Sequence, residues 1–370
     1  MSSGGPAFHG EGPPKGDTNP MARLSPAGDG PFPIPARTKS GRPRYSRHQR
    51  PGFSDLSILQ ERACAYSQAT RAPLTVAGYG SDWKIFAAWC EAYNVSPLPA
   101  SDATLAAFYT WCISDGGYRL STANRRLCGI RHQHAIHNLP DPVGPLTKAT
   151  RRGARRVFKQ RPVQKAALSV ELLRRIARRL LEDGRPRSLR DRALLVLGFA
   201  CGFRRSSLHR LQTGELEFLE QGLVVHERSS KTDQEGKGRD IPIFAGIHPE
   251  TCPIRAVRDW LAVRGDWEGP LFTAFHPRTA KAFFQRPLSD RDCVTRILKR
   301  CLRMIGLTPE EVSRFSSHSL RAGCITAAAE AGASDHEIMQ RSGHKTLHVM
   351  RQYIRSERLF PVRDPLRQAL

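Results

Sequence analysis

The 370-residue sequence contains no apolar stretch long enough to cross a membrane. A transmembrane helix needs roughly 18 or more consecutive apolar residues, and every apolar run in this chain is interrupted before that length. The opening residues 1–17 also lack the apolar core of a secretory signal peptide. We therefore expect an intracellular, cytoplasmic protein that does not insert into membranes.

Cysteine occurs nine times, but nowhere as the closely spaced Cys-x-x-Cys pair that is typical of metal sites and redox motifs. The number is odd, and most of the cysteines stand among apolar neighbours. This pattern predicts reduced, buried thiols that behave as small apolar side chains, and not a disulfide or metal framework.

Acidic residues are scarce relative to basic ones. The chain has 58 lysines and arginines against 34 aspartates and glutamates, a net charge of +24 at pH 7 and an isoelectric point near 10.4. A field of this sign attracts polyanions and displaces their counterions on contact. An anionic membrane surface would also attract it, but the sequence has no basic amphipathic helix with a bulky apolar face to dock there. The charge therefore favours a nucleic-acid partner.

Residues 1–53 are rich in glycine, proline and serine, lack periodic apolar residues and end in a basic run. A segment of this composition cannot bury enough apolar surface to offset the entropy of ordering it, which predicts disorder. It serves either as a solubilising tail or as an arm that follows a DNA backbone.

Residues 54–147 change to a helical pattern, in which apolar residues recur at steps of three and four. Ser101 is expected to cap the second helix, and a third helix is expected to begin near Ser121. The pattern predicts a small all-helical domain with its apolar stripes in the core. These stripes are Tyr79, Trp83, Phe86, Cys90 and Tyr93 on the first helix, and Leu105, Phe108 and Cys112 on the second.

Residues 148–167 are expected to link two domains. Eight basic residues and no acidic one stand between positions 148 and 165. Such a run is either a solvated face or a linker whose charge contacts a DNA backbone. The arginines that we predict to contact DNA come from this run and from the preceding helix: Arg125, Arg126, Arg131, Arg151, Arg152, Arg155 and Arg156.

Residues 168–370 are expected to form a second, larger domain. Ser169 is expected to cap a helix, and residues 188–200 predict a buried helix that stops at Gly202. Residues 214–244 carry short β-rich runs separated by turn residues, which predict three antiparallel strands. Further helices are expected over 252–264, 289–305, 318–331, 335–342 and 346–357. The fold class is therefore mainly α with a small antiparallel β-sheet.

The larger domain carries a spaced set of basic, histidine and tyrosine residues. An arginine follows the buried helix in GFRRSSL, and a lysine stands in the polar loop SKTDQEGKGR. HSLR places a histidine and an arginine on one face of a helix. A Gly-His pair comes next, and a tyrosine follows that histidine nine residues later. The set consists of Arg204, Lys231, His318, Arg321, His344 and Tyr353.

In this order and spacing the set resembles the tyrosine recombinase, or phage integrase, family, over roughly residues 55–360. The resemblance implies a helical core-binding domain followed by a catalytic domain, which together clamp double-stranded DNA. It also implies a site-specific recombinase or integrase that works as a homotetramer on paired sites. The tail after Tyr353 would then dock either in a neighbouring subunit or on its own domain.

Exchanging one alkoxide for another at a phosphodiester places negative charge on the non-bridging oxygens. The resemblance implies that Arg204 and Arg321 clamp these oxygens with planar, permanently charged guanidiniums. No carboxylate cluster is present to hold a metal, and no metal or nucleotide cofactor is expected.

The resemblance also implies the remaining roles. Tyr353 would be the nucleophile, and Lys231 the general acid that protonates the departing 5′ oxygen. His318 would be the acid–base partner, and His344 would donate a hydrogen bond to the phosphate. The implied product is a 3′-phosphotyrosine with a free 5′-hydroxyl, which can be religated without ATP because the link conserves the bond energy.

Position 207 departs from the family pattern. The family often has an acidic residue three positions after the first arginine, where its charge supports that arginine, but this chain has Ser207. The departure bears on the rate more than on the reaction type. Arg205 competes with Arg204 as the first arginine, but on a helix its side chain would point about 100° away, so Arg204 is preferred.

Two alternatives remain open. A catalytically silent DNA-binding regulator on the same scaffold would retain the positive charge but would have no use for a nucleophile. A type IB topoisomerase would share the phosphotyrosine chemistry, although the compact helical N-terminal domain and the His-x-x-Arg form favour the recombinase.

Overall fold

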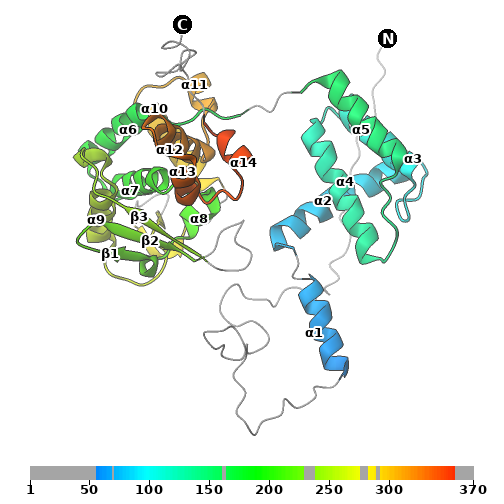
Figure 1. Ribbon diagram of the computed structural model, residues 1–370, viewed down its shortest axis with the longest axis horizontal. Coiled ribbons are helices and arrows are strands. Elements are labelled where there is room, and N and C mark those ends of the chain that lie inside the picture. The colour runs from blue at the N-terminus through cyan, green and yellow to red at the C-terminus, as the bar shows by residue number, and fades with distance from the viewer. Residues whose placement is uncertain are drawn as a thin grey trace, which may run out of the picture. The chain divides into compact units, whose positions relative to one another are not determined.

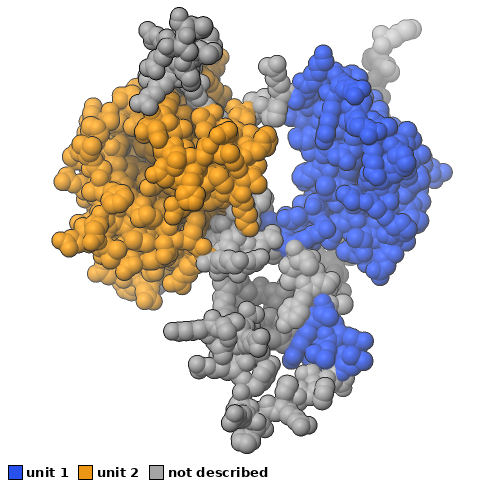
Figure 2. All heavy atoms as spheres, viewed as in Figure 1, with its two compact units in different colours: residues 1–160 blue, residues 161–370 orange. Residues whose placement is uncertain are grey.

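The computed structural model describes two compact units, residues 1–160 and residues 161–370 (Figure 2). Each unit has its own apolar core. The predicted disordered segment 1–53 and Lys231 lie outside the described residues. None of the helices in the described part of the chain is long and apolar enough to cross a membrane. The described ranges are 56–68, 71–160, 164–228, 238–275, 282–288 and 292–354.

The first unit consists of helices among its described residues (Figure 1). Helix α2 lies against α4, and α3 lies against α5. Their shared core contains Phe86, Phe108 and Ile130, which are fully buried. Ser101 caps α3 as predicted, because its Oγ accepts a hydrogen bond from the Thr104 N–H at 3.1 Å. The helices are α1 (Leu56–Gln68), α2 (Pro73–Ala92), α3 (Asp102–Ser114), α4 (Leu120–Ile136) and α5 (Pro145–Phe158).

The prediction of a linker over residues 148–167 needs a correction. Residues 148–158 are part of helix α5 and belong to the first unit. The Asp102 carboxylate accepts hydrogen bonds from the backbone N–H groups of Gly144 and Leu146, each at 2.9 Å. It therefore caps the start of α5 from another helix. Ala154 is buried on the inner face of α5, and this contact anchors a segment whose charge alone suggested a solvated linker.

The second unit is mainly α with small antiparallel sheets, as predicted (Figure 1). Helix α7 is its buried centre and packs against α6, α9 and α12. Ser169 caps α6 as predicted, because its Oγ accepts from the Leu172 N–H. The helices are α6 (Val170–Asp183), α7 (Pro186–Ala200), α8 (Arg205–Arg210), α9 (Pro253–Arg264), α10 (Cys293–Met304), α11 (Pro309–Ser313), α12 (His318–Glu330), α13 (Asp335–Ser342) and α14 (Leu347–Arg351), with 3-10 turns η1 (Thr213–Glu215) and η2 (Pro249–Thr251).

The predicted three-stranded sheet has the order β1–β2–β3 and is antiparallel throughout. Its strands are β1 (Leu216–Phe218), β2 (Leu223–Glu227) and β3 (Arg239–Ile243). In the pairing of β2 with β3, Glu227 stands opposite Arg239, at the end of the hairpin from which the Lys231 segment departs. A further antiparallel pair, β4 (Thr273–Phe275) and β5 (Ala282–Pro287), was not predicted from the sequence.

The end of α7 sets the direction of the chain toward the candidate site. Gly202 follows with a φ of 60°, a left-handed conformation that glycine adopts without strain. A Cβ atom there would lie 3.2 Å from the Cys324 Sγ of α12. The turn buries Phe203 in the core and leaves Arg204 as the residue that precedes α8.

Gly323→Ala should destabilise the second unit, because α12 packs directly on the backbone of Leu168. A Cβ at position 323 would lie 2.1 Å from the Leu168 carbonyl oxygen and 2.6 Å from the Phe199 ring. A backbone clash cannot be relieved by a rotamer change, so we expect the free energy of unfolding to fall by about 3 kcal/mol. Gly214→Ala is the control, since a Cβ there would have no atom of a non-adjacent described residue within 4 Å. Urea unfolding of both variants is measured by circular dichroism. Equal unfolding midpoints would contradict this packing.

Candidate active site

Arg321 lies at the centre of the candidate set and is almost completely buried, with 1% of the residue exposed. Its Nη1 donates to the Gly202 carbonyl oxygen at 2.6 Å, and its Nη2 lies 3.0 Å from Nε2 of His344. Burial lowers the pKa of this guanidinium, and the positive charge of Arg204 lowers it further. A cation held this rigidly in a poorly hydrated place interacts strongly with an anion.

Arg204 stands at the edge of the same cluster and is partly exposed. It precedes α8 in an extended conformation, and its Nη2 donates to the Gly343 carbonyl oxygen at 3.4 Å. Burial lowers the pKa of Arg204, while the negative charge of Glu227 opposes that shift. Arg204 therefore lies in the same cluster as Arg321. The structure supports the choice of Arg204 over Arg205, because the guanidinium of Arg205 is paired with Asp292 at 3.1 Å.

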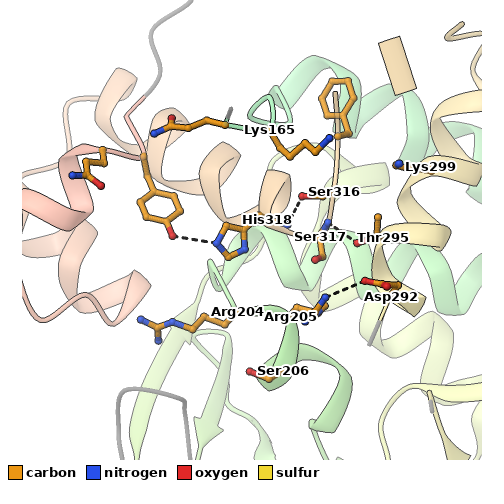
Figure 3. A pocket seen from close by; sticks show the side chains of 14 residues that line it. Lys165, Arg204, Arg205, Ser206, Asp292, Thr295, Lys299, Ser316, Ser317 and His318 are labelled. Carbon is orange, nitrogen blue, oxygen red and sulfur yellow. Dashed lines mark hydrogen bonds and ion pairs between the residues drawn. The ribbon is translucent and has the colours of Figure 1, made fainter. Parts of the chain in front are cut away.

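Tyr353 and His318 are in direct contact. The Tyr353 hydroxyl oxygen lies 3.2 Å from Nε2 of His318, the first residue of α12 (Figure 3). The phenol ring lies 5.0 Å from the His344 ring and 5.8 Å from the Arg321 guanidinium carbon. The Tyr353 backbone is held by its own hydrogen bond to Met350 and by the Thr326 hydroxyl, which donates to its carbonyl oxygen at 3.1 Å. The phenol therefore lies beside an imidazole nitrogen and close to a buried cation.

His344 follows α13 and is 8% exposed. The Ser342 hydroxyl donates to the Ile338 carbonyl at 2.6 Å and lies 2.8 Å from Nδ1 of His344. Because the serine proton is used on the carbonyl, Nδ1 donates to the serine oxygen, and Nε2 is left to accept from Arg321. Burial, with the charge of Arg321 as the next cause, lowers the pKa of His344 to about 3. The ring is therefore neutral at pH 7.

A cavity of about 690 Å³ opens beside these residues and is bordered by Arg204, His318 and Tyr353 (Figure 3). Two lysines that sequence reasoning did not place in the site, Lys165 and Lys299, also line it. Lys165 belongs to the end of the basic run, which the sequence suggested only as a linker. For Lys299, on α10, the sequence offered no signal beyond its charge.

Of the six predicted residues, five meet at one site, and Lys231 lies outside the described residues. The two residues that flank its segment do lie at the site. Glu227 ends β2, Arg239 begins β3, and their charges affect the pKa of Arg204. Sequence reasoning missed both. In the described part of the chain, no group of histidine, cysteine and acidic side chains is arranged to hold a metal ion.

Arg126, one of the arginines predicted to contact DNA, needs a correction. It is 3% exposed, its guanidinium lies 3.6 Å from the centre of the Tyr118 ring, and it bonds to Cys112 at 3.5 Å. A side chain packed in this way stabilises the core of the first unit and is not available to a DNA backbone. The prediction failed because the aromatic partner is supplied by the loop before α4.

The other six arginines have more exposed side chains. Arg125 and Arg131 are about half exposed but are paired with Asp82 and Asp141, at 2.7 and 2.5 Å. Arg151 donates to the Asn124 side chain at 2.8 Å. The remaining three lie exposed on α5, and no ion pair among the described residues involves them: Arg152, Arg155 and Arg156.

Comparison with known proteins shows that the chain is similar to integrases and recombinases. The model of the phage integrase family matches residues 168–358. An integrase/recombinase XerD homolog from Selenomonas ruminantium is 30% identical over 310 residues, which cover 82% of this chain and 87% of that protein. The Cre recombinase of Escherichia phage P1 is 23% identical over 286 residues, 73% of this chain and 80% of Cre.

Two solved structures share the fold. A λ integrase dimer bound to a COC′ core site has a TM-score of 0.54 at 17% identity and covers 82% of this chain and 96% of its own. The Tn1549 transposon integrase in complex with transposon right end DNA has a TM-score of 0.55 at 15% identity, with 85% and 98% covered. At these identities the likeness concerns the fold.

The contacts of His344 predict a neutral ring with its proton on Nδ1 in the DNA-free protein. In nitrogen-15 NMR of histidine-labelled protein, the His344 ring should carry its proton on Nδ1 and should not titrate between pH 5 and 9. An ordinary histidine, with a pKa of about 6.5, titrates within this range. His344→Gln identifies the signal by removing it. A ring that carries its proton on Nε2, or that titrates near its ordinary pKa, would contradict the hydrogen-bond pattern.

Proposed function

The chain belongs to the phage integrase family of tyrosine recombinases, and from this premise we propose how its site cleaves and rejoins DNA. The contact between Tyr353 and His318, at 3.2 Å, is the observation that carries the proposal. A phenol and an imidazole nitrogen lie together beside a buried guanidinium, and this arrangement supports transfer of a phosphoryl group to the phenol. A catalytically silent regulator would have no need of this arrangement.

The first step is attack of the Tyr353 oxygen on a DNA phosphorus. The phenol proton passes to Nε2 of His318 as the new O–P bond forms, and the bond to the 5′ oxygen breaks. Arg204 and Arg321 stabilise the charge on the non-bridging oxygens, since Arg204 lines the cavity beside Tyr353 and the Arg321 guanidinium carbon lies 5.8 Å from the Tyr353 ring. Lys231 gives its proton to the departing 5′ oxygen. Reversal of these transfers with a new 5′-hydroxyl rejoins the strand, without ATP or a metal ion.

The role of His344 needs a change of tautomer. In the DNA-free structure its Nε2 accepts from Arg321, so it has no proton to donate to a phosphate. When phosphate oxygens take over the Arg321 guanidinium, Nε2 is released. If the Ser342 hydroxyl then turns from Ile338 to donate to Nδ1, the neutral ring can carry its proton on Nε2 and donate to the phosphate.

Double-stranded DNA is the proposed partner, and the solved structures that share the fold include integrase complexes with DNA. Both units contribute basic residues, with Arg152, Arg155 and Arg156 on α5 as the freest candidates to contact the backbone. We propose that the units clamp one duplex and that a homotetramer exchanges strands between paired sites inside the cell. Another λ integrase structure is a tetramer bound to a Holliday junction. DNA recovered after crosslinking in cells supplies the substrate for the tests below.

Tyr353→Phe should abolish the covalent protein–DNA adduct and leave DNA binding intact, because it removes only the hydroxyl. The adduct is measured as protein that stays attached to labelled DNA in SDS, and binding by mobility shift at fixed salt. Tyr93→Phe, a change at an exposed tyrosine, is the control and should form the adduct normally. Persistence of the adduct in Tyr353→Phe would mean that another residue is the nucleophile.

Substitution of sulfur for the bridging 5′ oxygen should separate the general acid from the arginine clamp. A thiolate leaves without a proton, so Lys231→Ala should cleave this substrate at nearly the wild-type rate. On normal DNA the same variant should be slower by roughly 10²–10⁴-fold, as expected for loss of a proton donor. Arg204→Ala should stay slow on both substrates, because sulfur does nothing for the charge on the non-bridging oxygens. Equal rescue of both variants would show that the roles are not divided in this way.

A further inference from the structure

The place where the family often has an acidic residue is buried in this chain and is occupied by a serine. Ser207 lies in the first turn of α8, three residues after Arg204, and is 8% exposed. Its buried hydroxyl oxygen has no hydrogen-bond partner within the described residues. A serine cannot supply the negative charge that would support Arg204, so that charge must come from elsewhere if the arginine is supported at all.

Glu227 supplies a buried negative charge to the same arginine from another element. It ends β2, is 5% exposed, and its charge favours the protonated form of Arg204 against the effects of burial and of Arg239. One carboxylate oxygen, Oε2, is paired with Nε of Arg239 at 2.5 Å. The other, Oε1, is buried and has no hydrogen-bond partner among the described residues. A buried carboxylate is retained at such a place only where cations compensate it.

Arg239 connects this carboxylate to the turn that carries His344. Its Nη1 donates to the carbonyl oxygens of Gln340 and Arg341, in the last turn of α13, at 3.1 and 2.5 Å. A Cβ atom on Gly343 would lie 3.0 Å from the Arg239 guanidinium carbon, so the turn rests directly on this side chain. The carbonyl of Gly343 in turn accepts from Arg204. The glutamate therefore acts on both the arginine and the His344 turn.

We propose that Glu227 is the positioning carboxylate of the reaction and replaces the acidic residue missing at position 207. It balances Arg204 and Arg239 by charge and, through Arg239, fixes the Gly343–His344 turn beside the end of β2 and the start of β3. The inference rests on the proposed function, because it assigns a residue to that reaction. Glu227 touches no reacting atom, so its effect is on the geometry of the groups that do.

Glu227→Gln is the first test, since it removes the charge and keeps the shape. We expect single-turnover cleavage to fall by roughly 10²-fold, the scale of a small misplacement of the reacting groups. DNA binding at fixed salt should change little, and the sulfur substrate should give no rescue, because the loss acts through Arg204 and not through the leaving group. Glu217→Gln, at an exposed carboxylate on β1, is the matched control and should cleave normally.

The second test introduces a carboxylate at position 207, where the family often has one. Ser207→Glu, added to Glu227→Gln, should recover most of the cleavage rate, whereas a purely structural defect at β2 would not be repaired from α8. If Glu227→Gln does not fold, Glu227→Asp is used in its place, with and without Ser207→Glu. The aspartate withdraws the carboxylate by one methylene.

Two outcomes overturn the inference: wild-type cleavage by the Glu227 variant, or a slow variant that Ser207→Glu leaves slow. Failure of the wild-type protein itself to form an adduct would instead overturn the proposed function, so the two failures are distinguishable.

Discussion

The guanidinium of Arg321 is held where only 1% of the residue is exposed, and it joins three segments that are distant in the sequence. It rises from α12, donates to the carbonyl of Gly202 after α7, and lies against His344 after α13. A buried cation is costly unless its donors are used, so these contacts stabilise the packing of the three segments around it. The geometry of the site is therefore fixed by the same core that stabilises the second unit.

The electrostatic balance of the site explains how the buried arginines are tolerated and why they suit a phosphate. Arg204, Arg239 and Arg321 influence one another, as the lowered pKa of Arg321 shows, and Glu227 is the carboxylate that opposes this effect at Arg204. His344 remains neutral and adds no further positive charge. The excess positive charge is thus aligned before DNA arrives, and an anionic transition state meets groups that need little reorganisation.

Sequence reasoning succeeded where the relevant interactions are local. The turn at Gly202, the cap at Ser169 and the placement of His318 and Arg321 on one helix follow from one or two helical turns, and the structure shows all three. It failed where distant segments decide the outcome. The start of α5 is capped by Asp102, which no local pattern in the basic run reveals.

The same limit applies to two arginines. Arg126 is buried by Tyr118 from a preceding loop, and Arg239 meets Glu227 only because of the register of a hairpin.

The proposal that Tyr353 attacks DNA without a metal ion can be tested by mapping the covalent adduct. The adduct is formed in excess EDTA, digested with a protease, and its modified peptide is identified. We expect one modified peptide, with a nucleotide 3′-phosphate joined to Tyr353. Attachment to another residue or through a 5′-phosphate, or an adduct that forms only when magnesium is restored, would contradict it.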